Sequence, residues 1–141
     1  MQRTRDVMVT AIVLATVVLV GARAYAHHGT NINYDRSKQF TGKAVVTEFK
    51  YVNPHAQLYA DVMDEKGAVV HWNLELLPNP SQLIRNGWTR KKSVAALAPG
   101  TKIVVTIAPA RAGGTTGLLL KVTDEKGEEL LGGGPNAGGP P

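Results

Sequence analysis

The chain contains no cysteine at any of its 141 positions. Disulfide bonds, thiolate metal ligands and a cysteine nucleophile are therefore all excluded, and any folded domain must depend on its hydrophobic core. Aromatic residues are also few, at 6% of the chain, and none is interleaved with the one positive cluster, Arg90-Lys91-Lys92. We interpret that cluster as a solvated surface turn, because nucleic-acid binding surfaces combine positive charge with aromatic side chains.

The motifs of common enzyme classes are missing as well. No serine lies in a Gly-x-Ser-x-Gly sequence, and no His-Glu-x-x-His is present. The glycine-rich segment 113–117 lacks the Lys-Ser/Thr pair of a phosphate-binding loop, so we interpret it as a hairpin loop. Hydrolysis by paired carboxylates stays open, although most acidic residues lie in or next to expected turns. These observations favour a binding protein over an enzyme.

The first 26 residues have the three parts of an export signal. Arg3 and Arg5 give a positive start, residues 7–20 form an uncharged apolar run, and Ala24-Tyr25-Ala26 has the small-x-small form of a cleavage site. The apolar run is shorter than the roughly 20 residues that span a bilayer, so we predict a signal peptide over 1–26 in preference to a retained anchor. Cleavage would leave 141 − 26 = 115 residues with a formal charge of 13 − 10 = +3, located in the periplasm or secreted, with no stable membrane insertion.

Most of the remaining chain alternates apolar and polar residues with the period of β-strands. The pattern predicts strands over 41–51, 55–63, 68–77, 101–108 and 117–123, a short helix over 81–86, and a short segment over 128–131. In the first of these strands, one uninterrupted alternation places Val45, Thr47, Phe49 and Tyr51 on one face and Val46, Glu48 and Lys50 on the other.

This order of elements indicates a mainly β fold. Three strands, one short helix and two further strands are typical of a small five-stranded Greek-key barrel of the OB type, with the helix between strands 3 and 4 closing one end. A half-open sandwich is the competing architecture. We therefore predict a single β-barrel domain over 27–131, followed by a disordered Gly/Pro tail over 132–141.

Several landmarks along the chain resemble a known family. They are His27-His28-Gly29, Val52-Asn53-Pro54-His55, Trp72 with Glu75, Gly87-Trp88, and Leu97-Ala98-Pro99-Gly100. In this order they are similar to an uncharacterised family of exported bacterial proteins, a domain of unknown function with a His-His mature start. The resemblance implies export and a small β domain but names no reaction. The chain departs from the family pattern at Gly29-Thr30, where Ser-Phe is usual, and at His71.

Cleavage after Ala26 would make His27 the first residue, with a free α-amine and an imidazole that can chelate one metal ion. An α-amine has a pKa of about 7.7 and is partly deprotonated at neutral pH. Such a nitrogen-rich ligand set favours copper(II), with zinc or nickel as alternatives, and resembles the histidine brace of copper-dependent monooxygenases in its ligands alone. The candidate metal ligands are His27, His28 and His55. The competing interpretation is a frayed terminus and a turn histidine.

Glu75 interrupts an apolar strand and needs a partner if it is buried. Arg85 or Lys43 is a candidate for a structural ion pair, and contact with a ligand is the alternative. His71 lies four residues away on the same face, about 13 Å at about 3.3 Å per residue. The two side chains cannot share a metal, and we interpret His71 as a surface residue.

Two functions therefore remain open for this chain. The first is an exported periplasmic binding protein that holds copper(II) through the mature N-terminal histidine. The second is a metal-free OB-like module that binds a small apolar ligand or another envelope protein on the barrel face bearing Phe49, Tyr51 and Tyr59, with Glu75 as a further contact. Nucleic acid is not an expected partner, because the net charge shrinks after cleavage and the protein is exported.

Overall fold

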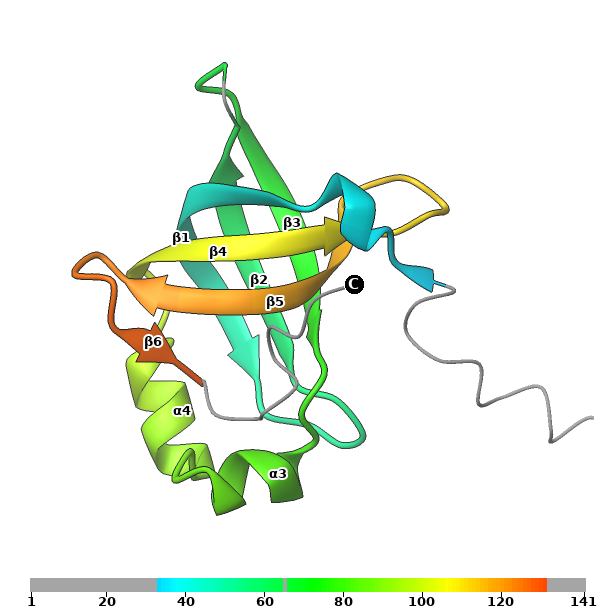
Figure 1. Ribbon diagram of the computed structural model, residues 1–141. Helices are drawn as coiled ribbons and strands as arrows, with labels where there is room; N and C mark the ends of the chain where they lie inside the picture. The colour runs from blue at the N-terminus through cyan, green and yellow to red at the C-terminus, as the bar shows by residue number, and fades with distance from the viewer. Residues whose placement is uncertain (1–32, 65, 132–141) are drawn as a thin grey trace, which may run out of the picture. The chain divides into compact units, whose positions relative to one another are not determined.

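The computed structural model of the chain describes residues 33–64 and 66–131 (Figure 1). The predicted signal peptide, His27, His28 and the Gly/Pro tail lie outside the described residues. In chain order the elements are η2 (Arg36–Lys38), β1 (Phe40–Lys50), β2 (Gln57–Met63), β3 (Val69–Leu76), α3 (Pro80–Arg85), α4 (Arg90–Ala96), β4 (Lys102–Pro109), β5 (Thr116–Asp124) and β6 (Glu129–Leu130).

The strands form a closed barrel. Their order is β3-β2-β1-β4-β5-β6, and a parallel pairing between β3 and β5 joins the two sides into a ring of five strands, to which β6 adds along β5. All other neighbouring strands are antiparallel. The predicted mainly β, OB-like barrel is confirmed.

The core follows the predicted alternation in three strands. Leu58, Ala60 and Val62 of β2 are all buried, and the inward residues of β3 and β4 include Leu74, Leu76, Ile103, Val105 and Ile107. Each face of these strands therefore carries the side chains that the period of two assigns to it.

β1 changes face part-way along its length. Ala44 and Val46 point into the core, a β-bulge lies between Val46 and Glu48, and beyond it Phe49 packs against the core instead. A bulge inserts one extra residue and so reverses which side chains point inward. The predicted uninterrupted alternation is wrong here, because Val45 lies on the opposite face of the sheet from Phe49 and is 40% exposed.

Two short helices, not one, connect β3 to β4 and cover one end of the barrel (Figure 1). α3 begins with a capping box between Asn79 and Gln82, in agreement with the predicted helix. Residues 90–92 are exposed as expected but form the first turn of α4, with Thr89 as its N-cap, and are not a turn between elements. Within the described segments no helix is both long and apolar enough to cross a membrane.

The segment before β1 packs on the outside of the barrel. Tyr34 forms an isolated bridge with Ala110, and flanking hydrogen bonds join Asp35 N to Pro109 O and Arg111 N to Asn33 O at 2.8 and 2.9 Å. The Tyr34 ring is buried with Ala108 and Leu118 in a small second cluster outside the main core. These contacts determine where the chain enters the barrel.

Candidate functional site

The candidate site is a group of three side chains, Tyr34, His55 and Glu75. Glu75 lies on the outward face of β3, opposite Gln57 of β2 and beside Leu118 of β5. The Tyr34 hydroxyl donates a hydrogen bond of 2.6 Å to Glu75 Oε2. The second oxygen, Oε1, lies 3.8 Å from His55 Nε2. Within the described residues Glu75 forms no ion pair with Arg85 or Lys43, so the partners suggested from the sequence are corrected to Tyr34 and His55.

His55 lies in the connection between β1 and β2, directly after the cis peptide bond Asn53-Pro54. The next residue, Ala56, is fully buried, and its carbonyl accepts a 3.0 Å hydrogen bond from Leu76 N. That bond holds the backbone of the connection against the end of β3, beside Glu75. The His55 Nδ1 atom is buried and meets no hydrogen-bond partner among the described residues.

The three side chains differ in their exposure to solvent. Tyr34 is 8% exposed, while the side chains of His55 and Glu75 are 34% and 26% exposed. Burial raises the pKa of the Tyr34 hydroxyl well above its usual range, and the hydrogen bond and negative charge of Glu75 raise it further. Tyr34 is therefore a permanent donor to Glu75 at neutral pH, and one face of the carboxylate stays open toward His55.

The described residues hold only part of the predicted metal set. His27 and His28 lie outside them, and no group of three or more His, Asp or Glu side chains within 33–64 and 66–131 is arranged to hold a metal ion. His55 is the one predicted metal ligand whose position the structure gives. A metal centre would need ligands from the undescribed start of the chain.

The aromatic residues predicted for ligand binding are not gathered on one face. Phe49 and Tyr51 pack against the core, and the Tyr51 hydroxyl donates to Pro80 O and Trp88 O at 3.1 and 3.2 Å. Tyr59 lies on the outer face of β2, where Lys50 Nζ is 4.6 Å from its ring centroid. The bulge in β1 separates them, because beyond it Phe49 and Tyr51 point inward.

A second histidine–carboxylate pair lies on β2 and β3. Asp61 of β2 is directly opposite His71 of β3, and His71 Nδ1 is 2.7 Å from Asp61 Oδ1. The His71 ring stacks on Tyr59 with centroids 6.4 Å apart. The side chain of His71 is 57% exposed, so its prediction as a surface residue is confirmed. The pairing with Asp61 was missed, although the register of the hairpin between β2 and β3 contains it.

The comparisons with known proteins point to one family. A family described as a family of unknown function, DUF6152, matches residues 14–121, more than three quarters of the chain. The protein belongs to the DUF6152 family. The predicted membership in an uncharacterised family is therefore confirmed, and no curated protein or solved structure matches the chain.

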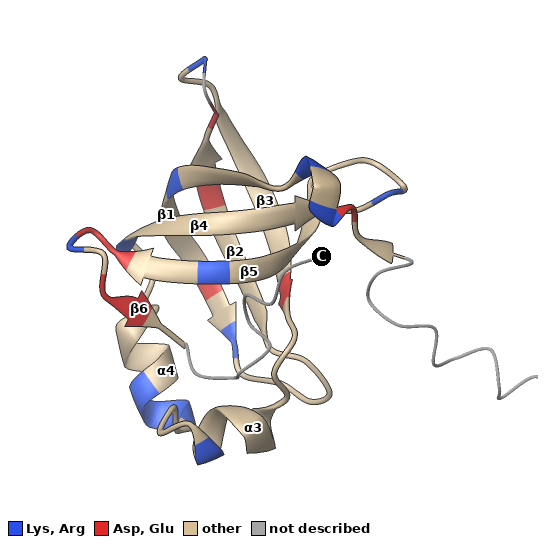
Figure 2. Cartoon of the chain, in the orientation of Figure 1, with Lys and Arg blue, Asp and Glu red and all other residues tan. Residues whose placement is uncertain are grey.

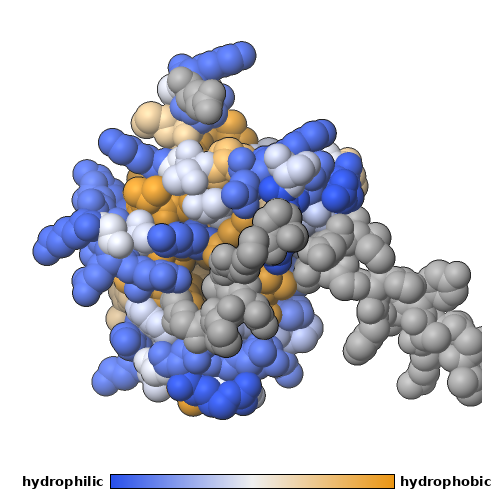
Figure 3. Space-filling model, viewed as in Figure 1, coloured by the Kyte–Doolittle hydropathy of each residue, from blue (hydrophilic) through white to orange (hydrophobic). Residues whose placement is uncertain are grey.

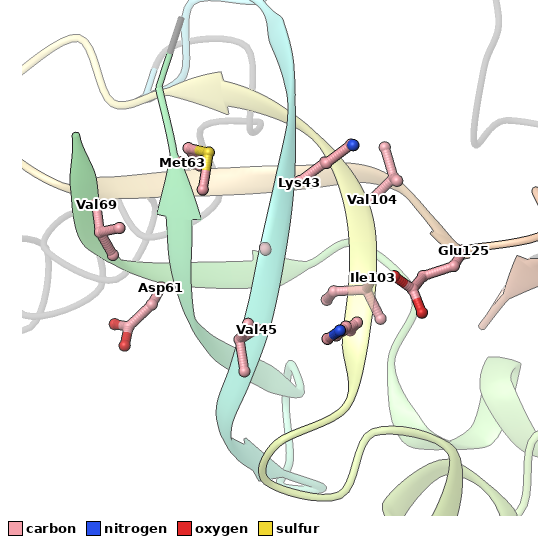
Figure 4. Close-up of a pocket in the computed structure, with 10 residues that line it drawn as sticks. Lys43, Val45, Asp61, Met63, Val69, Ile103, Val104 and Glu125 are labelled. Carbon is pink, nitrogen blue, oxygen red and sulfur yellow. The ribbon is translucent and has the colours of Figure 1, made fainter. Parts of the chain in front are cut away.

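The described part of this DUF6152 protein has one further hollow of interest, a groove of about 580 Å³ on the outer face of β1, β2 and β4. Figure 4 shows the side chains of Val45, Met63 and Val69 along it, with Lys43 extending over β4 toward Val104. Sequence analysis missed this groove because one unbroken alternation in β1 put Val45 on the same face as Phe49. Figure 2 shows positive residues gathered at the start of α4 and acidic residues around β6, while charged residues of both signs are spread along the other strands.

Proposed function

We propose that this protein is an exported periplasmic binding protein that holds copper(II) at its mature N-terminus, through the α-amine and imidazole of His27 together with His28 or His55. The observation that carries the proposal is the His55–Glu75–Tyr34 group at the place where the chain enters the barrel. Two of its features and the choice of metal support the proposal.

The first supporting feature is the orientation of His55. A ligating histidine commonly turns one ring nitrogen toward a carboxylate, which selects the tautomer and raises the basicity of the other nitrogen. In this protein Nε2 lies 3.8 Å from Glu75 Oε1, an electrostatic contact longer than a hydrogen bond, and the buried Nδ1 has no partner among the described residues. Glu75 is itself held by the Tyr34 hydroxyl, so the group forms an ordered support.

The second supporting feature is the position of Tyr34. His28 precedes Tyr34 by only six residues, a span of at most about 22 Å at 3.3–3.6 Å per residue. Tyr34 contacts Glu75 directly, so a connection of this length is sufficient for His28 to reach His55. A short tether raises the effective concentration of one ligand near another and so strengthens chelation.

The third argument concerns the choice of metal. An amine with two imidazoles is a nitrogen-rich set without thiolates, and among first-row divalent ions copper(II) binds such a set most strongly. Zinc and nickel suit the same atoms less well and are the alternatives that a competition experiment resolves.

The test compares two forms of the purified protein, one beginning at His27 and one with a single alanine added before it. Intact mass confirms each terminus and also reports where exported material is cleaved in the native host. We expect tight copper(II) binding with nitrogen hyperfine structure in the electron paramagnetic resonance spectrum of the first form, and loss of that site in the second. Equal binding by both forms, no binding by either, or exported material that begins elsewhere would overturn the proposal.

The second candidate function is a metal-free module for a small apolar ligand or another envelope protein. The face bearing Phe49, Tyr51 and Tyr59 does not support it, because these side chains point to opposite sides of the sheet. The groove along Val45, Met63 and Val69 favours it instead. Under this candidate, adding a residue before His27 leaves ligand binding unchanged.

A further inference from the structure

Exposed apolar side chains concentrate at one place on the described surface. Six large hydrophobic residues are exposed among the described residues, and three of them line the same groove: Val45, Met63 and Val69, at 40%, 49% and 63% exposure. Figure 3 shows hydrophobic surface in several places between hydrophilic residues on the face of the barrel seen there. An apolar hollow of about 580 Å³ falls in the range of sites that bind small molecules, about 300–1,000 Å³.

Strand register explains why the groove is continuous. Met63 pairs with Val69 across β2 and β3, and Lys43 pairs with Val104 across β1 and β4. Val45 lies two residues after Lys43 in β1, on the same face of the sheet, and is directly opposite Lys102 of β4. The apolar part of the floor is therefore built from unbranched and β-branched side chains, and none of the described residues that line it is aromatic.

Two lysines border this aliphatic floor. Lys43 and Lys102 both line the groove, and neither forms an ion pair with any described residue. Of the two acidic residues at the rim, Asp61 is already paired with His71, and Figure 4 shows its carboxylate turned away from β1. Glu125 is the remaining carboxylate, at the far side next to β4.

We propose that this groove binds a free single-chain aliphatic carboxylate, a fatty-acid-like molecule. The alkyl chain lies on Val45, Met63, Val69 and Val104, and the carboxylate pairs with Lys43 or Lys102. Aliphatic side chains offer an alkyl chain burial, worth about 25 cal/mol per Å² of apolar surface removed from water. They offer neither the stacking platform that a sugar or nucleobase ring would use nor hydrogen-bond donors other than the lysines.

The inference deepens the second candidate function and does not depend on copper. The groove lies at the Met63 end of β2, whereas His55 precedes the other end at Gln57. Six residues of strand separate Gln57 from Met63, about 20 Å at about 3.3 Å per residue. Both sites can therefore be occupied in one molecule, and each can fail without the other.

In the experiment, laurate below its micellar concentration is titrated into the protein that begins at His27. Two-dimensional amide NMR locates the binding site, and calorimetry measures the affinity. Dodecanol, dodecyl sulfate and dodecyltrimethylammonium serve as neutral, alternative anionic and cationic probes of equal chain length. We expect saturable laurate binding with shifts confined to β1, β2, β4 and the start of β3, with weaker binding of dodecanol and weakest binding of the cation. Equal affinity for all four probes, or amide shifts confined to other elements, would overturn the proposal. A parallel measurement uses anionic phosphatidylglycerol vesicles, and binding to the vesicles without binding to free laurate would also overturn it. Tighter binding of dodecyl sulfate would overturn the carboxylate specificity.

Matched variants locate the binding groups. The double variant Lys43→Gln/Lys102→Gln removes both cations of the groove, and we expect laurate affinity to fall by up to about fivefold while dodecanol affinity stays unchanged. Lys91→Gln, on α4, is the control for the lysine variants.

The apolar floor is tested with Val45→Thr, and Val94→Thr is its control. These valines are 40% and 42% exposed, and only Val45 lines the groove. An equal effect of control and groove variants would contradict the assignment, and the form extended before His27 should bind laurate normally.

Discussion

His55–Glu75 and His71–Asp61 are the same chemical pair in two different settings. Both carboxylates lie on the outer face of the hairpin between β2 and β3. The His71–Asp61 pair is the shorter, at 2.7 Å, but its side chains are 57% and 43% exposed. The His55–Glu75 pair is longer, at 3.8 Å, and less exposed, and it has Tyr34 as a buried third member.

The difference shows that contact distance alone is a poor guide to function. A short pair in water gains little free energy, because solvent screens the charges and the side chains lose entropy. A partly buried carboxylate that also accepts a hydrogen bond from a buried hydroxyl cannot lose a partner without leaving the other unsatisfied. We therefore expect the His55–Glu75 pair to contribute more to stability and function than the His71–Asp61 pair, and the following experiments test that difference.

The largest expected contrast concerns copper affinity. We expect His55→Ala to lower the copper(II) affinity of the protein beginning at His27 by about 100-fold, the upper range for disturbing a ligand's environment. His71→Ala should leave the affinity unchanged, since His71 lies among Asp61 and Tyr59 on the exposed face. Competition against a chelator of known affinity measures both. A comparable loss in the two variants would mean that the pairs are not functionally distinct.

The second contrast concerns stability. Glu75→Ala leaves the Tyr34 hydroxyl buried without its acceptor, which should lower the free energy of unfolding by about 1–3 kcal/mol. Asp61→Ala removes an exposed pair and should cost less than about 1 kcal/mol. Urea denaturation of the metal-free protein measures the difference. Glu75→Gln is the control that keeps an acceptor for Tyr34, and a loss as large as that of Glu75→Ala would assign the effect to charge.

The third contrast appears at alkaline pH. The pKa of Tyr34 is raised by burial and by Glu75, so its contribution to stability is complete below the unfolded-state value of about 10 and is lost as pH rises toward the folded-state value. Tyr34→Phe lacks this dependence. We expect the stability difference between wild type and Tyr34→Phe to narrow between pH 9 and pH 11 in urea denaturation. A constant difference would show that the hydroxyl ionises alike in both states.

The smallest expected effect belongs to His71. His71→Gln should change the free energy of unfolding by less than about 0.5 kcal/mol, as for most surface substitutions. Thermal unfolding at low and high salt provides the measurement. A loss above about 1 kcal/mol would reveal that stacking on Tyr59 supports the hairpin.

Much of the barrel could be predicted because burial imposes a period of two on each regular strand. The inward positions of β2, β3 and β4 follow directly from this pattern. The bulge in β1 could not be predicted, because Val46, Thr47 and Glu48 carry no glycine or proline to mark an interruption. α4 was missed for a related reason. The charges of Arg90 to Lys92 indicate exposure to solvent but do not distinguish a turn from the first turn of a helix.

The site was less accessible to prediction than the fold. The sequence singled out His55 and Glu75 separately, the first for its metal-binding imidazole and the second as a charge within an apolar strand. It contained no local signal that joins them, because they are 20 positions apart and meet only where the connection before β2 passes the end of β3. Tyr34 lies 41 positions from Glu75, which is too far along the chain for a local pattern to join the two residues.

The local pattern of side chains was sufficient to determine the strands, their turns and the mainly β character of the domain, because alternation and turn chemistry act between near neighbours. Closure of β3 on β5, the reversal of faces along β1 and the meeting of Tyr34, His55 and Glu75 were decided by the tertiary structure alone. These features depend on contacts between distant segments, and their free energy comes from fitting side chains together within one barrel.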